Sequence, residues 1–94
     1  MTDNERRELK AGTIFYQARF EPCEELIGSY ASMEEAKKAI KEYAEDLEEV
    51  NKYDFCIYEY KVTTNKNDHF HAKLLKVYSH EAGFRFKKIY EIEE

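Results

Sequence analysis

Along residues 13–20, Ile14, Tyr16, Ala18 and Phe20 alternate with Phe15, Gln17 and Arg19. A period of two, built from aromatic and β-branched residue types, predicts a strand. Residues 21–25 contain Pro22, and because proline cannot continue a central strand we expect a turn there. Residues 26–31 are again apolar and predict a short strand that returns beside the first.

The period changes to that of a helix after residue 31. Ser32 and Glu35 have the spacing of a capping box, in which the serine oxygen accepts the Glu35 amide and the glutamate reaches back to the Ser32 amide. Apolar residues then recur at spacings of three and four, which predicts one amphipathic helix of about four to five turns. Its apolar stripe comprises Met33, Ala36, Ile40, Tyr43, Ala44 and Leu47, with Val50 at its far limit.

Three more strands are predicted at residues 53–64, 69–78 and 84–92. Asn and Asp residues between the first two, and Gly83 before the third, are typical of turns. The element order is therefore β-β-α-β-β-β. We expect an α+β fold with a single antiparallel sheet of four to five strands and one amphipathic helix packed on one face. Residues 11–94 form this domain, and residues 1–10 are a polar tail.

The strand at 53–64 is unusual because both of its faces are apolar or aromatic, which a sheet covered on one side does not need. One face carries Tyr53, Phe55 and Ile57, and the other carries Cys56, Tyr58, Tyr60 and Val62. Tyrosines can sit on a half-exposed sheet with the hydroxyl in water. They are also enriched at interfaces, so we favour a second face that docks a partner through Tyr58 and Tyr60. In the last strand the alternation places Phe84, Phe86 and Tyr90 on one side and Ile89 on the other.

Charge is distributed unevenly along the chain, with an acidic first half and a basic segment in the second half. The net charge is −5, and residues 1–52 carry all of it, whereas residues 61–88 hold seven basic and two acidic side chains. The chain has no run of 18 apolar residues and its first residues lack the apolar stretch of a signal peptide, so we expect a cytoplasmic protein with no membrane association. In that compartment Cys23 and Cys56 are expected to be free thiols.

Motifs for catalysis are missing from the sequence. The three glycines are isolated, so there is no phosphate-binding loop, and no nucleophile elbow occurs. The spacing does not support a nucleophile pair of Cys23 with His69 or His71. We therefore expect no enzyme activity, no catalytic residue and no cofactor.

Two of the three histidines, His69 and His71, stand two apart on a predicted strand, so both side chains could reach one metal ion with His80 as a third ligand. The alternative is that they lie on the surface near the start of the strand. Because no carboxylate or cysteine pattern accompanies them, we predict no metal site.

Two charged segments are candidates for binding. The acidic end of the helix could meet a basic groove on a nucleic-acid-handling protein; its residues are Glu45, Asp46, Glu48 and Glu49. The basic C-terminal hairpin interleaves cations with aromatic residues, as in proteins that bind single-stranded nucleic acid; its cations are Lys73, Lys76, Arg85, Lys87 and Lys88. Alternation along a strand places most of these aromatics and cations on opposite faces, and the acidic chain weakens nucleic-acid affinity.

Residues 26–40 and 55–62 resemble a pattern common in small uncharacterised phage and bacterial domains, where a strand ending in Ser enters a helix through Glu-Glu-Ala and a strand then returns. The β-α-β-β-β order also resembles some phage anti-CRISPR proteins, which are small non-enzymatic inhibitors of nucleic-acid-guided nucleases. The resemblance carries no functional residue to this chain.

We therefore expect a non-enzymatic protein-binding module, in its most specific form a phage or mobile-element inhibitor of a host defence or nucleic-acid-handling complex. A small nucleic-acid-binding protein that uses the basic hairpin is the alternative. A protein is the expected partner, and a homodimer stays open.

Overall fold

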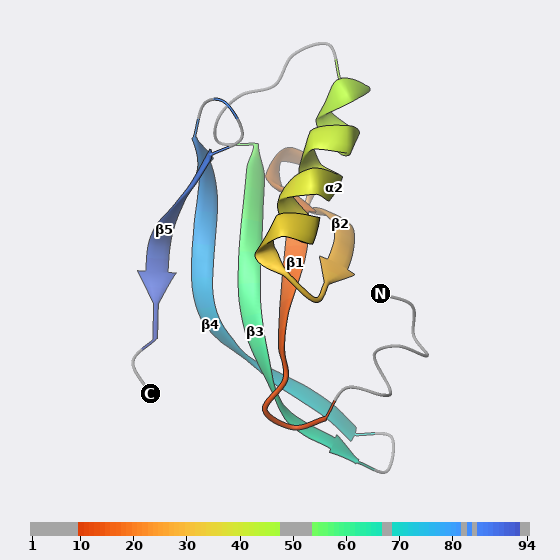
Figure 1. Cartoon of the computed structure of the whole chain (residues 1–94), viewed down its shortest axis with the longest axis vertical. Coiled ribbons are helices and arrows are strands. Elements are labelled where there is room, and N and C mark those ends of the chain that lie inside the picture. Colours follow the sequence, from red (N-terminus) through yellow and green to blue (C-terminus); the bar gives the residue numbers. More distant parts are fainter. Residues whose placement is uncertain (1–9, 48–53, 67–68, 82, 84, 93–94) are drawn as a thin grey trace.

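The computed structural model describes residues 10–47, 54–66, 69–81, 83 and 85–92. They form one antiparallel sheet, one α-helix and a short 3-10 turn (Figure 1). The elements are β1 (Ile14–Phe20), η1 (Glu21–Cys23), β2 (Glu25–Tyr30), α2 (Met33–Glu45), β3 (Phe55–Lys66), β4 (His69–Glu81) and β5 (Arg85–Glu91). The predicted α+β fold and its β-β-α-β-β-β order are confirmed. The predicted tail at residues 1–10 lies outside the described residues except for Lys10.

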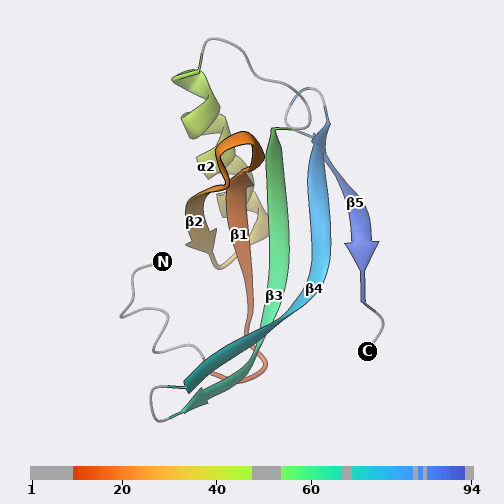
Figure 2. The same cartoon turned by 180° about the vertical axis from the view of Figure 1, so that it is seen from behind.

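The five strands lie in the order β2-β1-β3-β4-β5, with every neighbouring pair antiparallel. Helix α2 covers one face of the sheet on the side of β1 and β2 (Figure 1). Strand β5 lies at the opposite edge of the sheet. Viewed from behind, the strands are in front of the helix, and no described helix crosses them (Figure 2). The two faces of the sheet are therefore unequally covered.

The predicted cap begins the helix. The Ser32 hydroxyl accepts a hydrogen bond from the Glu35 amide at 3.2 Å. The Glu35 carboxylate accepts from the Ala31 amide at 3.2 Å, one residue before the partner that the capping box predicts. Helix α2 spans 13 residues and ends at Glu45, so it is shorter than predicted. Asp46 and Leu47, also in the predicted helix, follow its end, and residues 48–50 lie outside the described residues. No helix in the described part of the chain is long and apolar enough to cross a membrane.

Small residues bring the helix close to the sheet. Ala36, Ile40 and Ala44 on α2 are buried against Ala18 of β1 and the side chains of Phe55 and Ile57 on β3. Alanine at two of the three helix positions leaves room for the large rings of the sheet, which is how side chains of different size fill a core without voids. This packing assigns one face to the helix, hereafter the helix side.

Two strands extend further than predicted at their C-terminal ends. Strand β4 continues to Glu81, so His80 lies in a strand rather than in the predicted turn. The reason is packing, because the His80 ring is buried between Phe55 and Phe86, with ring centroids 5.9 Å and 5.4 Å away. Strand β3 likewise runs two residues further than predicted, to Lys66.

A bulge in β5 overturns the predicted faces of that strand. Lys88 lies opposite Tyr78, but Tyr90 lies opposite the adjacent residue Val77, so Ile89 is an extra residue. Such an insertion reverses the alternation beyond it. Phe86 is therefore on the helix side and Tyr90 on the other face, whereas strict alternation predicted that they share one.

Candidate functional site

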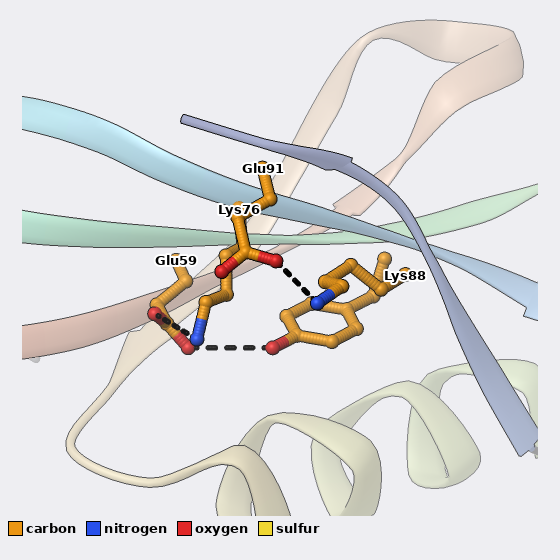
Figure 3. A network of polar contacts seen from close by, with 5 residues as sticks. Glu59, Lys76, Lys88 and Glu91 are labelled. Atoms are coloured by element: carbon orange, nitrogen blue, oxygen red, sulfur yellow. Dashed lines mark hydrogen bonds and ion pairs between the residues drawn. The ribbon is translucent and has the colours of Figure 1, made fainter. Parts of the chain in front are cut away.

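A network of charged and polar side chains surrounds Glu59, on the helix side of β3 (Figure 3). Glu59 is only 7% exposed. Its carboxylate lies 3.6 Å from the Lys76 ammonium and accepts a hydrogen bond from the Tyr78 hydroxyl at 3.5 Å. Tyr16 lies opposite Glu59 on β1 and interacts with its carboxylate, and Lys88 pairs with Glu91 beside it.

These contacts show a network that ties strands together. Burial, together with the charge of Glu59, raises the pKa of both Tyr16 and Tyr78 above the usual value for a phenol. Both phenols therefore remain protonated at neutral pH and can donate to the carboxylate. Donors from β1 and β4 surround the Glu59 oxygens, which is the arrangement that a buried carboxylate needs for stability. We interpret the cluster as structural.

The other face of the sheet carries the tyrosines that the sequence selected. Tyr58 and Tyr60 lie side by side on β3, with ring centroids 6.4 Å apart. Tyr60 stacks on Phe15 of β1 at 5.3 Å, and Phe15 in turn contacts Phe70 of β4 at 6.2 Å. The half-exposed tyrosines thus lie beside the buried ring of Phe15 on one face of the sheet, and alternation along β3 predicted that they share a face.

Tyr58 is held in place by two residues that the sequence analysis did not select. The Arg19 guanidinium lies 4.6 Å from the centroid of the Tyr58 ring, a cation–π contact. The Tyr58 hydroxyl donates to the Glu21 carboxylate at 3.1 Å. Burial and the nearby Glu21 charge raise the pKa of Tyr58. Arg19 stands at an outward position of an alternating strand, but only the register of β1 on β3 brings it to Tyr58.

Cys56 lies next to this group, opposite Ser79 of β4. Burial, followed by the Glu21 charge, raises the pKa of its thiol to about 11. The thiol is therefore protonated at neutral pH and is a poor nucleophile. The exposed Cys23 and the half-buried Cys56 are both free cysteines.

The same surface continues across β4 and β5. Val77 lies opposite Tyr58, and Tyr90 lies opposite Val77, which gives a row of apolar side chains across three strands. Lys87, opposite Ser79, adds an exposed cation at the edge. We call this surface the open face and define it by its side chains: Gln17, Arg19, Cys56, Tyr58, Tyr60, Val77, Ser79, Lys87 and Tyr90.

The acidic helix end lies on the helix side. Glu45 is the last residue of α2 and Asp46 is its C-cap, and both are exposed. Glu48 and Glu49, the other two predicted contact residues, lie outside the described residues. The two contact regions selected from the sequence therefore face in different directions.

The five cations of the basic hairpin do not form one surface. Lys76 and Lys88 are on the helix side and pair with Glu59 and Glu91. Lys73 lies opposite Lys61 on β3, also on the helix side by alternation. The other two cations, Arg85 and Lys87, are exposed on the open-face side of β5.

His71 and His80 are far apart. His71 is exposed on β4, whereas His80 is 4% exposed and lies nine residues further along the same strand, roughly 30 Å away at the rise of a strand. His80 therefore cannot complete a site with His71. No group of three or more His, Cys, Asp or Glu side chains among the described residues could hold a metal ion.

Chemistry and packing thus direct attention to the open face. It combines aromatic side chains with a guanidinium, and the hydrogen bond to Glu21 and the stacked ring of Phe15 fix the positions of the tyrosines. Comparison of the chain with protein-family models, with curated proteins and with solved structures finds no match.

Proposed function

We propose that this chain is a non-enzymatic protein-binding module that contacts its partner through the open face. One observation carries the proposal: a sheet face rich in aromatic side chains has no described element packed over it (Figure 2). Tyrosine and arginine are the residue types most enriched at the centres of protein interfaces. Arg85 and Lys87 at its edge favour a partner with an apolar patch and an acidic rim.

The open face is suited to binding because its main side chains are already ordered. Tyr58 is fixed by Arg19 on its ring and by Glu21 at its hydroxyl. Ordering one side chain at an interface costs about 0.5–1.5 kcal/mol, and a preformed contact avoids that cost. Rigid aromatic side chains therefore make efficient anchors.

The resemblance to small phage inhibitors supports a more specific version of this proposal. In it the partner is a host defence or nucleic-acid-handling complex, and binding blocks that complex. The acidic helix end at Glu45 and Asp46 would give a second contact, with a basic groove of the partner.

A pair of matched variants tests the proposal. Tyr58→Ser removes a tyrosine from the open face, and Tyr43→Ser removes one from the helix side whose hydroxyl also donates to a glutamate, Glu25, at 2.7 Å. Each tagged protein is used to capture partners from the source cells, with and without nuclease. We expect a stoichiometric, nuclease-resistant partner whose affinity falls about 30-fold with Tyr58→Ser, as for a central interface tyrosine.

The control and the folding check make the result decisive. Tyr43→Ser should keep the partner, and circular dichroism should show both variants folded. A partner lost equally with Tyr43→Ser, or retained in full with Tyr58→Ser, would contradict binding through the open face.

A nucleic-acid-binding function is the second candidate, because Arg85 and Lys87 lie on the same side of the sheet as Tyr58 and Tyr90. Aromatic rings beside cations suit single-stranded nucleic acid. Two features make it the weaker one: the Arg19 guanidinium occupies a face of the Tyr58 ring, and Lys76 and Lys88 are paired with carboxylates on the helix side. Binding of a single-stranded oligonucleotide that weakens steeply with salt would support it.

A further inference from the structure

Strand β5 is an edge strand with an unusual composition. It is the last strand in the sheet order, so one of its edges pairs with β4 and the other pairs with no described strand. Two of the three large apolar side chains exposed in the described residues are adjacent on it, Ile89 at 60% and Tyr90 at 46%. An exposed edge with apolar side chains is a template for another strand.

The charges of β5 indicate which kind of strand could pair with its outer edge. Arg85, Lys87 and Lys88 outnumber Glu91, so the strand carries a net charge of +2. Arg85 and Lys87 stand two apart on the open-face side, where acidic side chains two apart on a neighbouring strand would lie opposite them. The edge therefore fits an extended segment in which acidic and apolar residues alternate.

The uneven distribution of charge across the molecule also favours the β5 edge for an acidic segment. Residues 21–46, which include β2 and α2, hold eight carboxylates and three lysines, a net charge of −5. They lie at the other side of the sheet from β5 (Figure 1). A molecule polarised in this way attracts an acidic segment to the β5 edge and repels it from the β2 edge.

A second copy of this chain fits less well. Two β5 edges would bring like-charged strands together, which is unfavourable. The acidic edge strand β2 offers only its first two residues, Glu25 and Leu26, as exposed positions, because its remaining residues are buried or half-buried.

We infer that the outer edge of β5 binds an extended acidic segment of a partner protein, which adds a sixth strand to the sheet. This inference rests on the proposed function and identifies one way in which the partner is held. Backbone hydrogen bonds would supply affinity, and the cations of β5 would supply selectivity for acidic residues.

The test uses a ten-residue peptide of alternating glutamate and valine and a matched peptide in which proline replaces valine. Both have the same charge, but proline lacks the N–H that a strand needs. Amide chemical shifts are followed by NMR during titration. We expect the valine peptide to shift the amides of residues 85–91 and to bind on the order of tenfold more tightly than the proline peptide.

Charge reversal identifies the edge. Arg85→Glu with Lys87→Glu should lower the affinity for the valine peptide on the order of tenfold. The same charge reversal on the helix, Lys38→Glu with Lys41→Glu, should leave this affinity unchanged. Equal binding of the two peptides, shifts confined to other strands, no binding at millimolar peptide, or self-association through β5 in sedimentation would each overturn the inference. If the double reversal on β5 retains the natural partner while Tyr58→Ser loses it, the inference fails and the proposed function stands.

Discussion

The structural interpretation of the Glu59 cluster leads to a quantitative prediction. Glu59→Ala removes the acceptor shared by Tyr16, Tyr78 and the Lys76 ammonium. The protein should then be less stable but should still bind its partner, because the cluster lies on the helix side and not on the open face.

The magnitude follows from what each partner loses. A hydroxyl that loses its acceptor costs about 1–3 kcal/mol, and Tyr16 and Tyr78 are at the low end of this range because both are only half-buried. The Lys76 side chain is 32% exposed and can turn to water, so its loss adds little. We expect Glu59→Ala to lower the free energy of unfolding by about 2–4 kcal/mol. Glu59→Gln keeps the shape and one acceptor, and should cost about 1 kcal/mol. Lys76→Met should cost less than about 1 kcal/mol.

Thermal and urea unfolding measure this series. For a domain of this length 1 kcal/mol corresponds to about 4–8 °C in Tm, so the three variants should be clearly ordered. Partner capture is measured on the same proteins at a temperature where all are folded. A Glu59→Ala variant that keeps its Tm but loses the partner would refute the structural interpretation.

Three further predictions concern single side chains. Ser32→Ala should lower the free energy of unfolding by about 1 kcal/mol, because the Glu35 amide loses its acceptor; urea unfolding measures it, and an unchanged midpoint would rule out the cap. At pH 8 Cys23 should be alkylated rapidly and Cys56 slowly, because a thiol with a pKa of about 11 is only about 0.1% ionised at that pH. Peptide mass spectrometry measures the alkylation rate of each cysteine, and equal rates would contradict the burial of Cys56. The pKa of Tyr58 is higher in the folded state than in the unfolded state. The stability that Tyr58 contributes is therefore complete below the unfolded pKa of 10.0 and is lost as pH rises through the higher folded pKa. Urea unfolding at increasing alkaline pH should show this loss of stability, and the loss should be shallower for Tyr58→Phe.

Periodicity was sufficient to predict the elements of the fold and the orientation of β3. Phe55 and Ile57 face the helix and Tyr58 and Tyr60 face away, because the pairing of β3 with β1 continues without a shift through these residues. Alternation is a local property, and here the local pattern and the tertiary pairing agree.

The remaining features depend on pairing between distant strands. No residue type near Ile89 predicts a bulge, so the prediction that Tyr90 shares a face with Phe86 is wrong. Arg19 and Glu21 reach Tyr58 only through the register of β1 on β3, which alternation alone does not define. Glu59 could have been selected from the sequence, because it is a charged residue at an inward position of an apolar strand.

Site-specific photo-crosslinking tests the central claim most directly. A photoreactive phenylalanine analogue replaces Gln17 on the open face in one protein and Asp46 at the helix end in another, and each is irradiated in the source cells. We predict a discrete protein adduct from position 17, unchanged by nuclease. An adduct from position 46 with none from position 17, or an adduct to nucleic acid alone, would contradict protein binding through the open face.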